Sequence, residues 1–174
     1  NNFVPKRPKS CNLLFVGKNW ERKGGDIAYD AFSELKRYGL DVYLTIIGSS
    51  PPIDEPGVTV IPYLDKNKKE DYDRYLKILD QTTFLILPTR AECSAIVFAE
   101  ASAFGIPSIA TNTGGISTIV LQKKTGHLLS KQSKGKDYAK VIQDLYFDWD
   151  HYKRLSMTAR SYYENKLNWA SWSQ

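Results

Sequence analysis

The sequence is poor in the side chains that build disulfide frameworks, metal clusters and covalent catalytic centres. Its 174 residues include two cysteines, Cys11 and Cys93, and two histidines, His127 and His151. The cysteines lie far apart in different contexts, so their spacing indicates neither a disulfide framework nor a metal cluster. No serine–histidine–aspartate or cysteine–histidine arrangement is supported, and we interpret both histidines as structural. We therefore expect no metal ion at the functional site.

Long apolar runs and the common phosphate-binding motifs are also missing. No apolar stretch approaches the length of a membrane span. The G-x-x-x-x-G-K-[ST] spacing of a Walker loop and the G-x-G-x-x-G spacing of a dinucleotide fold are both absent. The composition, with 42% hydrophobic and 25% charged residues, is that of a globular protein. The length predicts one domain with a substantial core, and the low cysteine content favours a cytoplasmic location.

The charge balance points to an anionic partner without naming it. The net charge is +5 and the pI is near 9.1. Nucleic acid, an anionic membrane surface and phosphorylated metabolites all fit this balance, and so does a set of lysines that only solvate the surface. The basic residues are scattered among acidic ones. This argues against nucleic acid, which requires basic residues clustered on one face with aromatic side chains between them.

Strand and helix patterns alternate from one end of the chain to the other. Strands are expected at residues 12–16, 42–47, 58–61, 84–87, 108–110 and 126–129. Helices are expected at residues 26–38, 69–79 and 95–104, in a short segment ending at Val120, from Tyr138 to Trp149, and at residues 151–164. This order predicts an α/β fold with a doubly wound parallel sheet and right-handed crossovers. We expect residues 1–10 to form a linker, residues 11–149 the ligand-binding domain and residues 150–174 a helical extension.

Several candidate binding residues fall where these strands end. Gly17, Gly48, Glu92 and the Gly114–Gly115 pair each follow an expected strand. Ligands of parallel α/β sheets bind at the carboxyl ends of the strands. The convergence of these residues therefore predicts a binding site at that edge of the sheet.

The first loop reads V-G-K-N-W-E-R-K-G-G-D and carries two lysines, Lys18 and Lys23, around the turn into the first helix. Two ammonium groups beside a helix N-terminus can hold a diphosphate. The alternative interpretation is a lysine-rich surface turn. The loop T-G-G-I-S at residues 113–117 places two glycines before another helix, where backbone amides can face a phosphate or a sugar carboxylate.

Glu92 and Glu100 frame the stretch after the expected strand at residues 84–87. A carboxylate in a loop and a second one two turns into the next helix suit a hydroxyl-rich ligand, and the helix N-terminus between them suits an anion. A nucleotide sugar has both properties. A glycosidase pair is one alternative, but eight helical steps give about 12 Å along the axis, against the roughly 5–10 Å that such a pair needs. Two unrelated surface carboxylates are the other alternative.

Two segments together resemble a known family. F-V-G-K-N-W-E-R-K-G-G-D, followed by E-C-S-A-I-V-F-A-E-A-S-A-F-G-I-P-S-I-A-T-N-T-G-G-I, is similar to the C-terminal half of the family-four retaining glycosyltransferases. These enzymes have the GT-B architecture, in which two Rossmann-like domains face each other across a cleft. The resemblance covers residues 13–129. It includes two glutamates eight positions apart, two basic residues five positions apart and the double glycine, in the family's order.

The resemblance implies a role for each matching residue. Lys18 and Lys23 would bind the diphosphate and stabilise it as it leaves, and Glu92 would contact hydroxyls of the donor sugar. These three are the predicted catalytic residues. Glu100 would accept hydrogen bonds from the ribose hydroxyls, and the backbone at residues 61–63 would receive the base. The complete predicted donor-binding set is Gly17, Lys18, Lys23, Gly48, Pro62, Tyr63, Glu92, Ser94, Ala95, Ile96, Glu100, Gly114 and Gly115. The nucleoside diphosphate sugar would be a substrate, with no cofactor.

The sequence departs from the family pattern at a few of these positions. Ser94 and Ala95 stand where an aromatic residue and a glycine are common, and Ala95 narrows the backbone freedom there. Lys18 lacks the bidentate fork that arginine offers to phosphate. Thr118 stands where a glutamate is frequent. These differences leave the donor sugar open, and the base is open as well.

In the resembled family the acceptor site belongs to an N-terminal domain. The chain opens with the extended segment N-N-F-V-P-K-R-P-K-S, and we expect it to be part of a longer protein whose N-terminal domain it lacks. The implied acceptor is a sugar or a lipid-linked glycan in glycan biosynthesis, with peripheral contact at the inner face of a membrane. Tyr162, Trp169 and Trp172 are expected to pack against the other half, and the alternative is that they only cap the edge of the sheet. The alternative function is a non-catalytic nucleotide- or nucleic-acid-binding module of the same fold.

Overall fold

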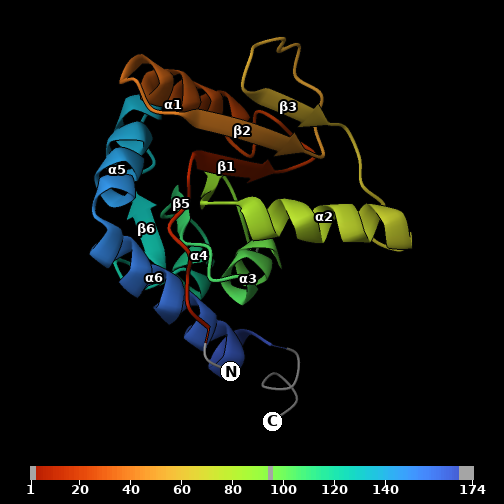
Figure 1. The fold of residues 1–174 in the computed structure, drawn as a ribbon. Helices are drawn as coiled ribbons and strands as arrows, with labels where there is room; N and C mark the ends of the chain where they lie inside the picture. Colours follow the sequence, from red (N-terminus) through yellow and green to blue (C-terminus); the bar gives the residue numbers. More distant parts are fainter. Residues whose placement is uncertain (1–2, 94–95, 169–174) are drawn as a thin grey trace.

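A computed structural model describes residues 3–93 and 96–168, and its centre is a parallel sheet with helices on both faces (Figure 1). Within these residues the sheet has six strands in the order β3-β2-β1-β4-β5-β6, and all of the neighbouring strands run parallel. The strands are β1 (Cys11–Val16), β2 (Val42–Ile47), β3 (Val58–Ile61), β4 (Phe84–Leu87), β5 (Ser108–Thr111) and β6 (Gly126–Leu129). The α/β doubly wound fold predicted from the sequence is confirmed.

The helices divide between the two faces of the sheet. They are α1 (Gly25–Arg37), α2 (Lys69–Gln81), α3 (Ile96–Ala103), α4 (Ile116–Ile119), α5 (Gly135–Phe147), α6 (Trp149–Tyr162) and the π-helical turn η1 (Tyr163–Leu167). Figure 1 shows α1 and α5 packed together on one face and α2 and α3 on the other. Helix α6 contacts both α5 and α3. None of the helices in the described ranges has the length and apolar character needed to cross a membrane.

The strand boundaries agree with the sequence pattern, whereas the start of α6 does not. Strands β2, β3, β4 and β6 begin and end at the predicted residues. The sequence pattern placed Trp149 in the helix that starts near Tyr138, but that helix ends at Phe147 and Trp149 opens α6. The break occurs because the Asp148 carboxylate accepts a hydrogen bond from the backbone N–H of His151 at 3.0 Å, and thereby caps a new helix. The predicted helix start at Ala95 lies outside the described residues.

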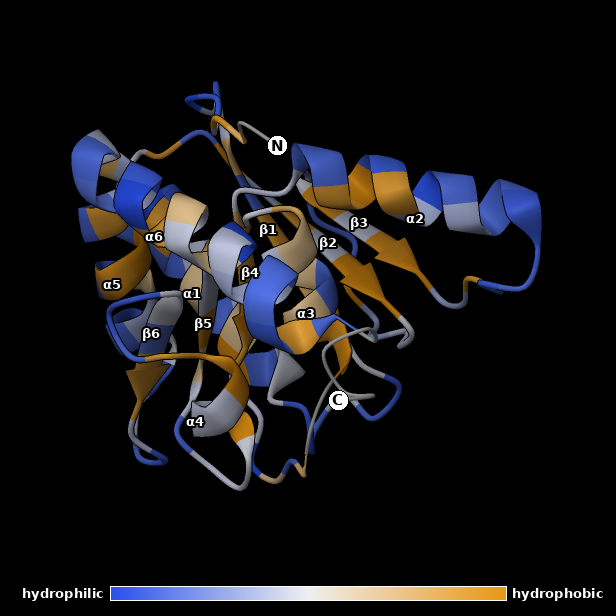
Figure 2. Cartoon of the chain, turned by 90° about the horizontal axis from the view of Figure 1, so that it is seen from below, coloured by the Kyte–Doolittle hydropathy of each residue, from blue (hydrophilic) through white to orange (hydrophobic). Residues whose placement is uncertain are grey.

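The core is densest around β4, where all four side chains are fully buried. A strand covered on both faces needs apolar residues at every position, and F-L-I-L meets that need. Helix α2 is amphipathic, and Figure 2 shows its apolar stripe against a mostly polar remainder. Its buried residues are Tyr75 and Leu79, one turn apart. Each fully buried large apolar side chain contributes about 1.5–3 kcal/mol, so this stripe holds α2 in place.

The order of the strands creates a topological switch point between β1 and β4. The chain leaves β1 toward β2 on one side, and the later strand β4 pairs with β1 on the other side. The loops that follow β1 and β4 therefore leave the sheet side by side at the carboxyl edge. In open α/β sheets a crevice forms at this point and receives the ligand.

Gly24 lets the loop after β1 press against the end of β4. Its φ is 73°, and a Cβ built there would lie 2.0 Å from the carbonyl oxygen of Pro88. The contact is reinforced by the backbone N–H of Arg90, which donates to the carbonyl of Arg22 at 2.9 Å. Only glycine adopts the left-handed conformation without strain and also leaves room for the Pro88 carbonyl, because it has no Cβ.

We predict that Gly24→Ala lowers the free energy of unfolding by about 3 kcal/mol, because it combines left-handed backbone strain with a clash against backbone atoms. Gly39→Ala is the matched control, since Gly39 also has a positive φ, of 81°, but a Cβ there meets nothing within 4 Å. It should lose only about 1 kcal/mol. Urea denaturation measures both values, and equal losses would contradict the importance of the Gly24 contact.

Candidate functional site

Three loops meet at the carboxyl edge of the sheet: residues 17–24 after β1, residues 88–93 after β4 and residues 112–115 after β5. The guanidinium of Arg22 donates to the carbonyl of Ala91 at 2.9 Å and ties the first loop to the second. Gly114 has a φ of 54°, and a Cβ there would lie 1.8 Å from the carbonyl oxygen of Glu92. A Cβ on Gly115 would lie 2.5 Å from the carbonyl oxygen of Cys93. The double glycine thus lets the third loop rest directly on the second.

Lys23 and Glu92, both predicted from the sequence, form an ion pair where these loops meet. The Lys23 Nζ donates to Glu92 Oε2, and the other oxygen, Oε1, accepts from the backbone N–H of Cys93 at 3.2 Å. The side chains are only 13% and 9% exposed. A cation and a carboxylate are therefore held together in a nearly enclosed position, each compensating the charge of the other.

Gly17 and Gly48 bring the ends of β1 and β2 close to Lys23. A Cβ on Gly17 would lie 2.8 Å from Lys23 Cγ, and one on Gly48 would lie 3.5 Å from the backbone nitrogen of Lys18. The side chain of Lys18 is exposed. The structure therefore brings together Gly17, Lys18, Lys23, Gly48, Glu92, Gly114 and Gly115 from the predicted set.

The predicted base-receiving segment, Pro62 and Tyr63, follows β3 at the same edge of the sheet. The backbone N–H of Gly48 donates to the carbonyl of Ile61 at 3.0 Å, so this segment begins beside the end of β2. Both side chains are exposed, Tyr63 to 63%. The predicted residues Ser94 and Ala95 lie outside the described residues.

Glu100 has a separate set of partners on α3. One carboxylate oxygen, Oε2, accepts a hydrogen bond from the hydroxyl of Tyr75 at 2.7 Å, and the other, Oε1, pairs with the ammonium group of Lys66. Glu100 and Ile96 line a groove of about 630 Å³ between α2, α3 and η1. Glu92 does not line this groove, so the two glutamates that the sequence pattern linked have different surroundings.

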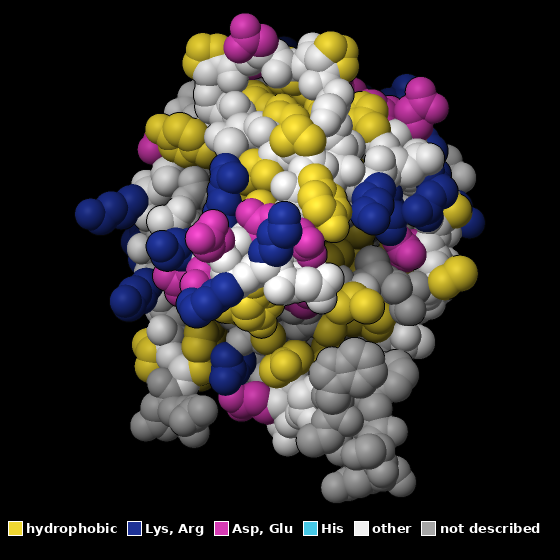
Figure 3. Space-filling view, turned by 90° about the vertical axis from the view of Figure 1, so that its right-hand side faces the viewer, with side chains coloured by type: hydrophobic (Ala, Val, Ile, Leu, Met, Phe, Trp, Pro, Cys, Tyr) yellow, Lys and Arg dark blue, Asp and Glu magenta, His cyan; other side chains and the backbone are white. Residues whose placement is uncertain are grey.

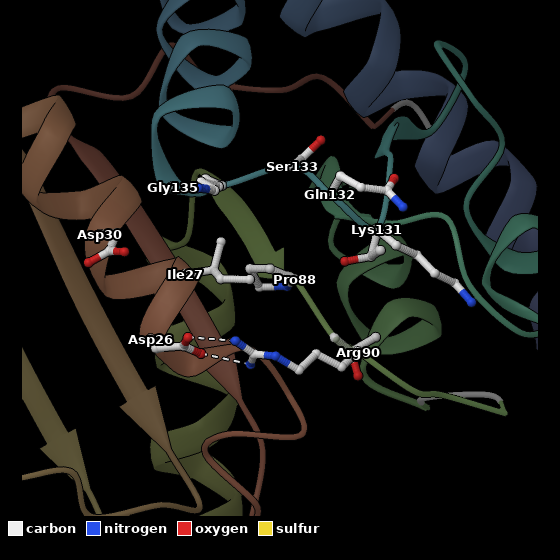
Figure 4. A pocket seen from close by; sticks show the side chains of 12 residues that line it. Asp26, Ile27, Asp30, Pro88, Arg90, Lys131, Gln132, Ser133 and Gly135 are labelled. Atoms are coloured by element: carbon white, nitrogen blue, oxygen red, sulfur yellow. Dashed lines mark hydrogen bonds and ion pairs between the residues drawn. The ribbon is translucent and has the colours of Figure 1, made fainter.

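A second cavity, of about 420 Å³, opens between the N-terminal ends of α1 and α5 and the end of β4 (Figure 4). Arg90 reaches across its mouth and donates to both carboxylate oxygens of Asp26, at 2.8 and 2.6 Å. These hydrogen bonds from Arg90 lower the pKa of the Asp26 carboxyl. None of the predicted donor-binding residues lines this cavity. We place the candidate site at the Lys23–Glu92 pair instead, because the predicted residues Gly17, Lys18 and Gly48 lie beside that pair.

Sequence reasoning missed the residues that hold the predicted ones in place. Arg22, Lys66 and Tyr75 contact the site loops or Glu100 but were not singled out from the sequence. The one available signal was the phenol of Tyr75, a polar group in the apolar stripe of α2 that would need a buried partner. Across residues 3–93 and 96–168, no three histidine, cysteine or acidic side chains gather as metal ligands.

The comparison with known proteins identifies the family. Residues 10–148 match the family model described as "Glycosyl transferases group 1". The chain belongs to this family. The resemblance inferred from the sequence is thereby confirmed for the group 1 glycosyltransferases, and the solved relatives share the GT-B fold.

Curated proteins of several kinds are similar to this chain. A D-inositol 3-phosphate glycosyltransferase of Paenarthrobacter aurescens (strain TC1) is 28% identical over 154 residues, which are 82% of this chain and 37% of that protein. A glycogen synthase of Mycobacterium tuberculosis (strain H37Rv) is 30% identical over 71% of this chain and 32% of its own length. The chain spans 48% of the length of one similar curated relative, a putative glycosyltransferase of a Sulfolobus islandicus filamentous virus, and a smaller share of the two above.

Solved structures of group 1 and related glycosyltransferases share the fold. The C-terminal domain of a glycosyl transferase group 1 family protein from Francisella tularensis has a TM-score of 0.74 at 18% identity. The alignment covers 93% of this chain and 88% of that one. The Anabaena protein HepE, solved in complex with UDP-glucose, has a TM-score of 0.74 at 15% identity, covering 90% of this chain and 44% of that one. The chain therefore matches most of the Francisella domain and less than half of the HepE chain.

We predict that Glu92→Gln lowers the free energy of unfolding by about 2–3 kcal/mol, because it leaves the enclosed charge of Lys23 uncompensated. The control is Asp73→Asn, which removes the carboxylate partner of Lys69 from an exposed pair on α2. That change should cost less than about 1 kcal/mol. Thermal and urea unfolding of the two variants provide the comparison, and similar losses would show that the Lys23–Glu92 pair is no more important than a surface pair.

Proposed function

We propose that this chain is the donor-binding domain of a retaining glycosyltransferase. The reaction would transfer a glycosyl group from a nucleoside diphosphate sugar to a hydroxyl acceptor. The observation that supports this most directly is the enclosed Lys23–Glu92 pair at the switch point of the sheet. It stands where a parallel α/β sheet receives its ligand, and it stands in a chain that belongs to the group 1 glycosyltransferases.

In the proposed mechanism the ion pair opens as the donor enters. The Lys23 ammonium group turns to the diphosphate, together with the exposed Lys18, and the two lysines offset the charge that develops as the diphosphate leaves. Glu92 is thereby free to accept hydrogen bonds from hydroxyls of the donor sugar. The lysines supply the positive charge, so the proposal includes neither a metal ion nor another cofactor.

The remaining predicted residues would surround the nucleotide. We assign the ribose hydroxyls to Glu100 and the base to the exposed backbone at Pro62 and Tyr63. The backbone at residues 94–96 and at Gly114–Gly115 would face the diphosphate or the donor sugar. UDP is the first nucleotide to test, because UDP and UDP-glucose are bound in the solved structures of HepE, which has the same fold.

The acceptor would be held by the other half of the GT-B architecture. We propose a sugar or a lipid-linked glycan as the acceptor, and a lipid-linked one would bring the whole protein to the inner face of a membrane. We expect this domain alone to bind the donor weakly and to transfer little or no sugar, because the acceptor side of the cleft lies on the other domain. Detectable transfer by this chain alone would contradict that expectation.

The alternative function is a non-catalytic module that binds a nucleotide or nucleic acid. Figure 3 looks along α2 from its N-terminal end and shows basic and acidic side chains interleaved rather than separated on that face. A nucleic-acid site would need a basic patch with aromatic side chains. Salt separates the alternatives, because affinity for nucleic acid falls steeply with ionic strength, whereas an enclosed donor site should respond modestly.

We predict that calorimetric titration detects saturable binding of one of UDP, GDP and ADP, or of its sugar derivative. Lys23→Ala should weaken that binding by about 10-fold or more, because a hydrogen bond to a charged group contributes about 1.5–3 kcal/mol. Glu100→Ala should weaken it as well. Lys140→Ala is the matched control, since Lys140 is an exposed lysine on α5 whose partner is Asp144.

The proposed function fails if no nucleotide binds at millimolar concentration, or if Lys23→Ala and Lys140→Ala bind it equally well. Binding that disappears between 50 and 200 mM salt, in the way that phosphate-backbone contacts do, would favour the nucleic-acid alternative.

A further inference from the structure

The phenol of Tyr75 is buried, and its hydroxyl contacts the carboxylate of Glu100, the proposed ligand of the ribose. Tyr75 is only 1% exposed, and its hydroxyl donates to Glu100 Oε2 at 2.7 Å across 25 residues of sequence. A tyrosine hydroxyl in such a place requires a partner, because leaving it unpaired costs about 1–3 kcal/mol. Its neighbour in the stripe, Leu79, is purely apolar, so packing α2 on the sheet does not by itself need a hydroxyl there.

Tyr75 and Lys66 together restrain the carboxylate of Glu100 from two sides. The Lys66 ammonium group pairs with Oε1 and also lies over the ring of Tyr75, 4.0 Å from its centroid. The three side chains thus form a closed triangle of contacts. A glutamate on a helix surface ordinarily samples several rotamers, and these contacts favour one orientation of the Glu100 carboxylate.

The two restraints leave half of the acceptor capacity of the carboxylate unused. An ionised carboxylate has about four lone-pair sites, of which Tyr75 and Lys66 each occupy one. Glu100 is still 26% exposed and lines the groove between α2 and α3. Two acceptor sites in a defined plane match the two adjacent hydroxyls of a ribose.

Burial and the nearby Glu100 carboxylate raise the pKa of the Tyr75 hydroxyl, in that order of importance. The phenol therefore keeps its proton at neutral pH and remains a donor there. The Lys66 side chain is 43% exposed, so water competes for its ammonium group. Of the two restraints, the buried hydroxyl is the more persistent one.

We propose that Tyr75 is a positioning residue that orients Glu100 for recognition of a vicinal diol, the ribose of the nucleotide. This inference rests on the proposed function, in which Glu100 binds the ribose hydroxyls. It adds that the selectivity for ribose over deoxyribose depends on a tyrosine that does not itself contact the ligand. Such pre-organisation raises affinity because the acceptor does not have to be ordered when the ligand binds.

The test compares each of UDP, GDP and ADP with its 2′,3′-dideoxy analogue by calorimetry on this chain. In the unmodified protein the ribonucleotide that binds should do so more tightly than its dideoxy form. Tyr75→Phe keeps the ring and removes one hydroxyl. It should reduce that preference by about 3–10-fold, the equivalent of one hydrogen bond, and leave the affinity for the dideoxy nucleotide unchanged. Tyr72→Phe is the matched control, because Tyr72 lies one turn away in the same groove and should leave the preference intact.

The dideoxy nucleotide also serves as the folding control. If Tyr75→Phe weakens both nucleotides equally, or leaves the preference unchanged, Tyr75 acts only in packing and the inference is wrong. In the Glu100→Ala background Tyr75→Phe should have no further effect on the preference, and a full effect there would equally overturn it.

Failure of the proposed function has a different signature. In that case the unmodified protein binds none of the nucleotides, or Glu100→Ala keeps the full preference for ribose, and the inference about Tyr75 falls with it.

Discussion

The close approach of three backbone segments at the carboxyl edge of the sheet is the constraint on which the candidate site depends. Gly24 presses the loop after β1 against Pro88, and Gly114 presses the loop after β5 against Glu92. A side chain at either glycine would force these loops apart, because its Cβ would lie 2.0 Å from the Pro88 carbonyl oxygen or 1.8 Å from that of Glu92. Because the backbones are in contact, the side chains of Lys23 and Glu92 can form an ion pair although they lie 69 residues apart in the sequence.

Most of the charged side chains proposed to bind the donor have partners within the domain itself. Lys23 and Glu92 neutralise each other, and Glu100 is held by Lys66 and Tyr75. An unpaired charge at the enclosed position of Lys23 or Glu92 would cost several kcal/mol, so the two side chains stabilise each other within the fold. They also set a requirement for the proposed function, in which the donor would have to replace the Lys23–Glu92 contact with contacts at least as favourable.

The two glutamates that define the sequence motif have different physical settings. Glu92 sits on a loop in a nearly closed position, with a lysine as its partner, whereas Glu100 sits on a helix at the rim of an open groove. Such a difference is compatible with the proposed ligand, whose donor sugar would bind near Glu92 at the switch point of the sheet and whose nucleoside would bind near Glu100 in the groove.

The sequence by itself determined the strands, most of the helices and the loops that carry the candidate residues. Apolar runs bounded by glycine and proline report burial and turns locally, so β2, β3, β4 and β6 could be predicted to the residue. The resemblance to the glycosyltransferases could also be found from the order of the charged residues and glycines. A break at a single capping residue, as at Asp148, is a weaker local signal, and the boundary between α5 and α6 was misplaced for that reason.

Only the tertiary structure decided which side chains meet. The Lys23–Glu92 pair, the Arg22 contact with Ala91 and the Tyr75 hydrogen bond to Glu100 depend on the order of the strands and on the rotation of α2 against α3. A one-dimensional pattern contains neither of these quantities. It shows that a side chain is buried or charged, but its partner is set by long-range packing, in which a helix turned by one residue, about 100°, presents a different face.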